Sequence, residues 1–138
     1  MHYVNGNTIR TFTLTKSIEY ANDQIAHTIY DNLIKLKTDR FNRVHIPEYH
    51  HTINGSIVTI VSDYIKGFYN LAAENIIMED VVLRKSEYTF NDYHRQNYIV
   101  CDNTNKTYMV DLESYCHFPS IRKRLEYFKR DWTDIKWT

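Results

Sequence analysis

Short apolar runs separated by turn-forming residues predict three β-hairpins in this chain. Two of the turns contain the dipeptide Asn-Gly, at residues 5–6 and 54–55, and the third is a polar segment at 102–106. Asn-Gly tolerates the positive φ that both central positions of a tight two-residue turn require. The runs predicted to pair are 2–4 with 8–14, 50–53 with 56–61, and 98–101 with 107–110.

Apolar residues at helical spacing predict three helices. The longest covers residues 18–37, with Ser17 as its N-cap. Its apolar stripe is formed by Ile18, Ile25, Ile29, Leu33 and Leu36. A second helix is expected within residues 71–88, with Ala72, Ile76 and Leu83 facing inward, and a third from Pro119 onward. The order of hairpins and helices predicts an α+β fold with little parallel pairing.

The composition argues against nucleic-acid-binding, disulfide-rich and membrane-spanning proteins. The 138 residues suit one domain, and 17 basic residues balance 17 acidic ones, so no net charge attracts nucleic acid or an anionic membrane. Two cysteines are too few for a disulfide framework, and the longest apolar runs are much shorter than a membrane span. We therefore expect a cytoplasmic protein that binds neither nucleic acid nor membrane. Abundant Tyr, Asn, Ile and Lys suggest an AT-rich source genome, such as that of a phage, a virus or an AT-rich bacterium. For a protein encoded by a phage, we expect the host cytoplasm.

Three oxygen-bearing side chains bracket the third predicted hairpin. Asp92 and Asn97 lie in the loop FNDYHRQN before it, and Asp111 follows in the strand segment YMVDLESY. A tight hairpin brings its open ends together, so we expect Asn97 and Asp111 to be neighbours. Oxygen ligands of this kind bind Mg²⁺ against phosphates, and a carboxylate can receive the proton of an attacking hydroxyl. The plainer alternative is that Asp92 and Asn97 are turn residues bonding their own backbone.

The loop and the strand together resemble the protein kinase superfamily. Its catalytic loop reads H-R-D-x-x-x-x-N and is followed, after a hairpin, by D-F-G. DYHRQN is similar to the D-x-H-x-x-N loop of aminoglycoside and small-molecule kinases, and VDLE is similar to their I-D-x-E/D motif. The resemblance implies ATP and Mg²⁺ as cofactors, Asp92 as catalytic base, and Asn97 and Asp111 as metal ligands. The implied fold is a truncated kinase-like α+β fold.

A second segment extends this resemblance. IVTIVSDYIKG is similar to the family's hinge, where a strand runs into an acidic-Tyr-Ile-x-Gly connector. The resemblance implies that adenine bonds the backbone near Asp63, Tyr64 and Ile65. It divides a single domain into an N-terminal lobe at 1–62, a hinge at 63–67 and a reduced C-terminal lobe at 68–138.

The chain departs from the family pattern in several places. No G-x-G-x-x-G loop precedes the long helix, and Phe90 and Asn91 replace the usual residues before the catalytic Asp. The phosphate-binding cation could be Arg10 or Lys16; we favour Lys16. In the family this cation pairs with an acidic residue of the long helix, which would be Asp23, or Glu19 as second choice. Much of the usual C-terminal lobe is missing, although Asp131 could anchor the catalytic loop.

Three functions are compatible with these residues. The first is a minimal kinase acting on the hydroxyl group of an unidentified substrate. The second is a pseudokinase that binds nucleotide or a partner without turnover, which the missing glycine loop and short C-terminal lobe favour. The third is an unrelated metal-dependent phosphodiesterase, which would leave the hinge-like segment unexplained. The short C-terminal lobe also allows a homodimer, in which a second copy covers the catalytic half.

Overall fold

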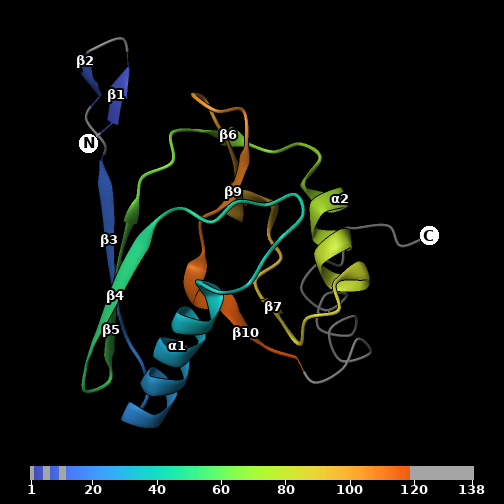
Figure 1. The fold of residues 1–138 in the computed structure, drawn as a ribbon. Helices are drawn as coiled ribbons and strands as arrows, with labels where there is room; N and C mark the ends of the chain where they lie inside the picture. Colours follow the sequence, from blue (N-terminus) through green and yellow to red (C-terminus); the bar gives the residue numbers. More distant parts are fainter. Residues whose placement is uncertain (1, 5–6, 10–11, 119–138) are drawn as a thin grey trace.

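The computed structural model describes residues 2–4, 7–9 and 12–118, with side chains described from residue 12 (Figure 1). The fold is α+β, as predicted. Its strands are β1 (His2–Val4), β2 (Asn7–Ile9), β3 (Thr13–Glu19), β4 (Tyr49–Asn54), β5 (Ile57–Asp63), β6 (Gly67–Tyr69), β7 (Tyr88–Phe90), β8 (Tyr98–Cys101), β9 (Thr107–Met109) and β10 (Tyr115–His117). The predicted turn at 5–6, Arg10, and the last helix with Asp131 lie outside the described residues.

The strands form four small antiparallel sheets. Their orders are β1-β2, β3-β5-β4, β6-β8-β9 and β7-β10. The predicted hairpins β4–β5 and β8–β9 are confirmed, and Gly55 has the positive φ of 61° that the Asn-Gly turn requires. The predicted strand at 8–14 is wrong in extent, because it is divided between β2 and β3, which belong to different sheets.

Helix α1 (Asp23–Leu36) begins later than predicted. Asn22 is its N-cap, with a side-chain oxygen that accepts from the amide of Ile25 at 2.8 Å. Ser17 and Ile18 instead belong to β3, where Ile18 pairs with Val58 of β5. A β-branched residue next to a strand run fits an extended chain as well as a helix, so periodicity alone misplaced this boundary.

The second helix is shorter than predicted and changes its winding. The α-helical part, α2 (Ala73–Met78), continues as a π-helical turn, η1 (Glu79–Leu83), closed by the bond from the amide of Arg84 to the carbonyl of Glu79. The wider turn shifts which side chains face inward. Ile76 is buried as predicted, but Leu83 is 70% exposed and Ala72 is also exposed.

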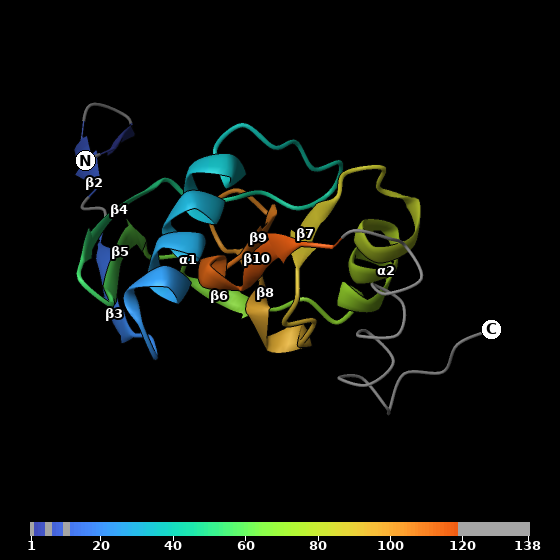
Figure 2. The same ribbon diagram turned by 90° about the horizontal axis from the view of Figure 1, so that it is seen from below.

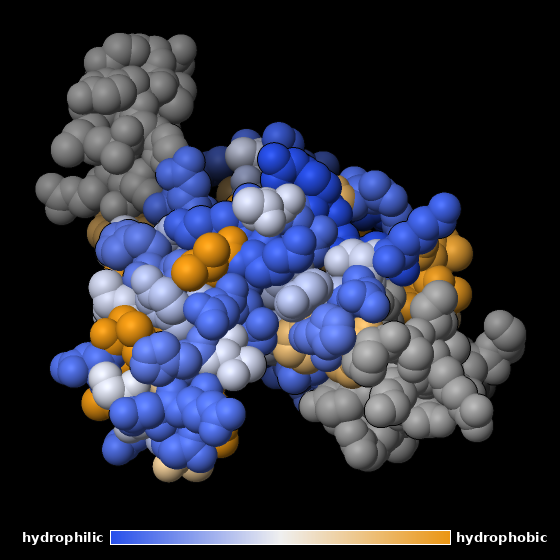
Figure 3. Space-filling view, turned by 60° about the horizontal axis from the view of Figure 1, so that its bottom comes forward, coloured by the Kyte–Doolittle hydropathy of each residue, from blue (hydrophilic) through white to orange (hydrophobic). Residues whose placement is uncertain are grey.

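Helix α1 lies between the β3-β5-β4 sheet and the β7–β10 pair in both ribbon views (Figures 1 and 2). One continuous apolar core joins these elements. It includes Ala26, Leu33 and Leu36 of α1, Val58 and Ile60 of β5, and Ala73, Ile76, Ile77, Val81, Phe90, Tyr93, Tyr98, Met109, Leu112 and Tyr115 from the second half of the chain. The face in Figure 3 is mostly hydrophilic with scattered apolar residues. No helix among the described residues has both the length and the apolar character needed to cross a membrane.

The connector after β5 packs tightly on β8. Gly67 opens β6 opposite Cys101, and a Cβ atom at Gly67 would lie 1.8 Å from the carbonyl oxygen of Val100. No other residue type fits this approach without moving the backbone. The glycine therefore fixes how the first sheet is joined to the β6-β8-β9 sheet.

Candidate active site

The β8–β9 hairpin brings Asn97 beside Asp111. Tyr98 pairs with Met109, and the amide of Val110 donates to the carbonyl of Asn97 at 2.9 Å. The Asn97 side-chain amide donates to Asp111 Oδ2 at 3.3 Å and to the backbone carbonyl of Asp92 at 3.1 Å. The three residues that the sequence singled out therefore lie together. Both donor positions of the amide are in use, and no hydrogen bond to Asn97 Oδ1 occurs among the described residues.

A second strand pair fixes the other end of the loop. Phe90 of β7 lies opposite Tyr115 of β10, and the amide of Asn91 donates to the carbonyl of Ser114 at 2.9 Å. Ser114 closes a short 3-10 turn, η3 (Leu112–Ser114), by donating its hydroxyl to the carbonyl of Asp111 at 2.7 Å. The loop carrying Asp92 and the turn carrying Asp111 are thus held side by side by backbone bonds.

Asp92 presents its carboxylate at the edge of this arrangement. The side chain is 39% exposed, and its Oδ1 lies 3.2 Å from Nε2 of His94. A partly exposed carboxylate within reach of solvent can accept a proton from an incoming hydroxyl. His94 can donate to Asp92 and so hold the orientation of the carboxylate.

Lys16 crosses from the first sheet to this site. It occupies the middle of β3, opposite Ile60, and its ammonium lies 3.6 Å from Asp111 Oδ1 and in direct contact with Glu113. Sequence reasoning included Glu113 in the matched motif VDLE but gave it no role. No sequence pattern indicates that Glu113 faces Lys16, because this depends on the 3-10 turn that directs both Asp111 and Glu113 toward the Lys16 ammonium.

The expected pair of Lys16 with Asp23 is wrong. Asp23 opens α1 beside the β4–β5 turn, with its Oδ1 3.9 Å from the point where a Cβ of Gly55 would lie. Lys16 lies opposite Ile60 of β5, five residues after Gly55. This separates Lys16 from the turn, and so from Asp23, by about 16 Å of extended strand. Glu19 fails for a different reason, since an odd spacing from Lys16 along β3 puts it on the opposite face.

The acidic groups of the site shift one another's ionisation. Burial, together with the neighbouring carboxyl groups of Glu113 and Asp92, raises the pKa of Asp111 to about 8. Burial alone would raise the pKa of Glu113, but hydrogen bonds with Asp111 and Lys16 hold that pKa below its ordinary value. Burial would lower the pKa of Lys16, yet the contacts with Glu113 and Asp111 raise it. Burial and acidic neighbours therefore keep Asp111 largely protonated at neutral pH, and a cation bound at its oxygens would favour its ionised form.

An open cleft of about 540 Å³ lies at these residues. Its polar lining includes Lys16, Asp92, Asp111 and Glu113, and its apolar lining comes from Ile18, Tyr20 and Ile29. A second cleft, of about 530 Å³, lies between the end of α1 and β4 and includes none of the site residues. Among the described residues, no group of three or more His, Cys, Asp or Glu side chains is arranged to hold a metal by itself.

Asp63 ends β5, the central strand of the sheet that carries Lys16, and Tyr64 and Ile65 follow directly after it. The amides of Asp63 and Tyr64 already donate to the carbonyls of Glu48 (2.9 Å) and Phe12 (2.7 Å). The backbone of Ile65 makes no hydrogen bond within the described part of the chain. Of the three residues expected to bind adenine, Ile65 is therefore the one whose backbone amide and carbonyl can both form hydrogen bonds with the base.

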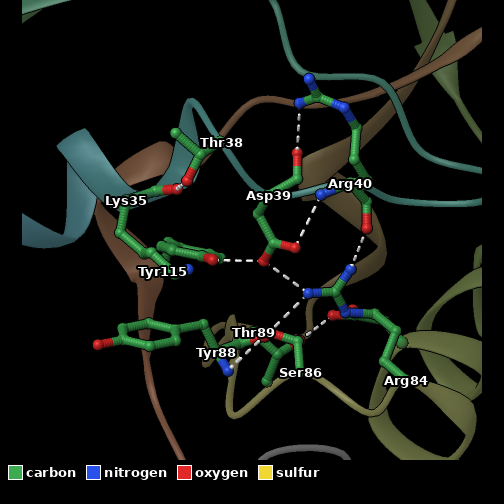
Figure 4. A network of polar contacts seen from close by, with 10 residues as sticks. Lys35, Thr38, Asp39, Arg40, Arg84, Ser86, Tyr88, Thr89 and Tyr115 are labelled. Carbon is green, nitrogen blue, oxygen red and sulfur yellow. Dashed lines mark hydrogen bonds and ion pairs between the residues drawn. The ribbon is translucent and has the colours of Figure 1, made fainter.

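A buried ionic network joins the segment after α1, the π-helical turn and β10 (Figure 4). Arg84 bonds Asp39 and Asp80 at 2.6 Å each, and Tyr115 donates its hydroxyl to Asp39. The side chains of Arg84 and both aspartates are each at most 11% exposed. Because Tyr115 belongs to β10, the network ties the end of α1 and the π-helical turn to the strand that follows the site.

No model of a known protein family matches the chain, and no curated protein sequence matches it.

Proposed function

We propose that the protein is a minimal kinase-like phosphotransferase that uses ATP and Mg²⁺ to transfer the γ-phosphate to a hydroxyl group. One observation carries the proposal: Asp92, Asn97 and Asp111 meet around one hairpin, and Lys16 reaches them from another sheet. The elements also follow one another in the order that the family resemblance implies: β3, α1, β4, β5, the connector, α2, the loop with Asp92 and Asn97, and the β8–β9 hairpin that leads to Asp111.

The residues present fit a magnesium ion. Mg²⁺ is often bound by one or two protein oxygen ligands together with substrate phosphates and water, so a cage of three carboxylates is not needed. Asp111 and Oδ1 of Asn97 would hold the ion. The pKa of Asp111 is raised first by burial and then by its acidic neighbours, and a divalent cation would relieve the repulsion from those neighbours. When bound, Mg²⁺ neutralises phosphate charge and orients the phosphates.

The nucleotide would lie along β3. Leu14 shares a face of the strand with Lys16 and is 52% exposed, so an adenine ring can pack against it while Lys16 pairs with phosphate. The Ile65 backbone would recognise the edge of the base. This orientation directs the γ-phosphate toward Asp111 and Asp92.

Asp92 would act as the general base. Its carboxylate accepts the hydroxyl proton while the hydroxyl oxygen bonds to the γ-phosphorus and the bond from that phosphorus to ADP breaks. His94, 3.2 Å from Asp92, keeps the carboxylate oriented.

The test is turnover of γ-labelled ATP with a mixture of alcohols, amino alcohols and host proteins as acceptors. We expect Mg²⁺-dependent phosphate transfer that Asp92→Ala abolishes, with the thermal shift on adding ATP retained. Asp102→Ala, in the exposed β8–β9 turn, is the matched control and should retain transfer. Turnover that survives Asp92→Ala would refute the assignment of the base.

A pseudokinase is the second candidate, and two observations favour it. The amides of Asp63 and Tyr64 are already used within the sheet, and no glycine-rich loop precedes α1 to cover the phosphates. In this case ATP would stabilise the fold by mass action without any transfer of phosphate. Absence of a thermal shift with ATP, with or without Mg²⁺, would exclude the kinase and a nucleotide-binding pseudokinase, and would leave only a pseudokinase that binds a partner.

A further inference from the structure

We propose that Glu113 is the positioning residue that holds the ammonium of Lys16 at the site, in place of a carboxylate from helix α1. This inference rests on the proposed function, because it assigns the residue that orients the phosphate-binding cation.

The helix offers no counter-ion to Lys16. Its residue on the cleft is Ile29, and Tyr20, just before the helix, also lines the cleft. Asp23 is at the far end of the β4–β5 hairpin, beside Gly55. The α1 side of the cleft is therefore apolar, and the anchor for Lys16 has to come from elsewhere.

The turn after Asp111 supplies that anchor. Glu113 lies in η3, and two hydrogen bonds fix this turn. The Ser114 hydroxyl donates to the carbonyl of Asp111, and the Asn91 amide donates to the carbonyl of Ser114. The Glu113 side chain is only 15% exposed, whereas that of Lys16 is 51% exposed. The carboxylate is thus the rigid partner and the lysine the flexible one. A lysine side chain loses roughly 2 kcal/mol of rotamer freedom when fixed, so a preset partner is needed to hold it.

The charges explain why two carboxylates face one ammonium. Lys16 contacts Glu113 directly but stands 3.6 Å from Asp111. Because Glu113 balances Lys16, Asp111 is not needed as the partner of the lysine, and its oxygens are available to a cation that displaces its proton. Lys16 then keeps its ion pair with Glu113 when Asp111 binds a cation. The Lys16 ammonium therefore stays at the site, where it would contact the phosphates of a bound nucleotide. The position of Lys16 is consequently set by the same turn that presents Asp111.

The test follows the Lys16 ammonium directly by ¹⁵N NMR of lysine NH₃⁺ groups, assigned with Lys16→Arg, in nucleotide-free protein. An ion-paired ammonium exchanges slowly enough to give a signal. We expect the signal in the wild type, its loss in Glu113→Gln, its partial return in Glu113→Asp, and its retention in the control Asp23→Asn. In parallel, Glu113→Gln should raise the Kd for MgATP several-fold, and Asp23→Asn should not change it.

The outcomes separate the two proposals. Retention of the Lys16 signal in both Glu113 variants, or its loss in Asp23→Asn, overturns the role of Glu113. If Glu113→Gln does not fold, Glu113→Asp decides, since the shorter carboxylate must weaken the signal. Wild-type protein that shows the signal but does not bind ATP would overturn the proposed function and leave the ion pair established.

Discussion

The side chain of Asn97 donates a hydrogen bond to the carboxylate of Asp111 at 3.3 Å, although fourteen residues separate them. The β8–β9 hairpin makes this contact, and the same amide also bonds the backbone of Asp92. One asparagine thus links the proposed base to the proposed metal ligand. The carboxylate of Asp111 is mostly buried and lies among other acids, and this arrangement lowers the stability of the fold at neutral pH.

Replacing Asp111 by Asn should stabilise the protein. The pKa of Asp111 is raised to about 8 from 3.8, chiefly by burial, so the folded state holds a proton that the unfolded state releases between these pH values. Wild-type stability therefore falls as pH rises through that window. The lowered pKa of Glu113 has the opposite effect on stability, but only at pH values near or below its ordinary pKa of 4.5.

The measurement is the Tm of both proteins from pH 5 to 9. We expect Asp111→Asn to exceed the wild type by an amount that grows up to about pH 8 and is then constant. For a domain of this size, roughly 3–5 °C corresponds to about 1 kcal/mol. A variant that is less stable than the wild type at pH 8 would show that Asp111 is not a strained acid.

Gly67→Ala should be strongly destabilising. The added Cβ would meet the Val100 carbonyl oxygen at 1.8 Å, so β6 must separate from β8. We expect a loss of more than about 2 kcal/mol in the free energy of unfolding, measured by urea denaturation. Gly55→Ala is the matched control: it meets no close atom but has φ at 61°, and should lose about 1 kcal/mol. Equal losses would contradict the close approach of these strands.

Arg84→Met should strongly destabilise the fold, because it breaks the buried network of Arg84 with Asp39 and Asp80. The variant leaves Asp39 and Asp80 buried without their cation, which typically costs about 3–5 kcal/mol. Lys85→Met, at the exposed neighbouring position, should stay within about 0.5 kcal/mol of the wild type. Thermal denaturation of the two variants distinguishes a buried ion network from a surface one, since a surface network would make both changes small.

Leu14→Glu should weaken ATP binding without weakening the fold. Leu14 is half exposed on the face of β3 that carries Lys16, and a carboxylate there would repel phosphate and remove an apolar surface for the base. We expect at least a tenfold rise in the Kd for MgATP by calorimetry and an unchanged Tm. The control is Leu71→Glu, at a side chain 91% exposed, which should bind ATP as the wild type does. Similar affinities for both variants would exclude β3 as the nucleotide platform.

The sequence predicted those features that local turn chemistry decides. The Asn54-Gly55 turn, the β8–β9 hairpin and the contact of Asn97 with Asp111 all follow from short-range patterns. The start of α1 was misplaced because Ile18 suits a strand or a helix equally well. The π-helical turn was missed because one extra residue in a turn leaves no local signal. The partner of Lys16 depends on how two sheets meet, which no spacing within either sheet encodes.

Paramagnetic broadening by Mn²⁺ tests the central claim most directly, since Mn²⁺ can replace Mg²⁺ at an oxygen site. Substoichiometric Mn²⁺ with ATP is added to ¹⁵N-labelled protein, and amide signals are followed. We expect those of Asp92, Asn97 and Asp111 to broaden first, and Asp111→Ala to abolish the effect. Broadening centred elsewhere on the protein, or unchanged in Asp111→Ala, would contradict a shared cation site at these three residues.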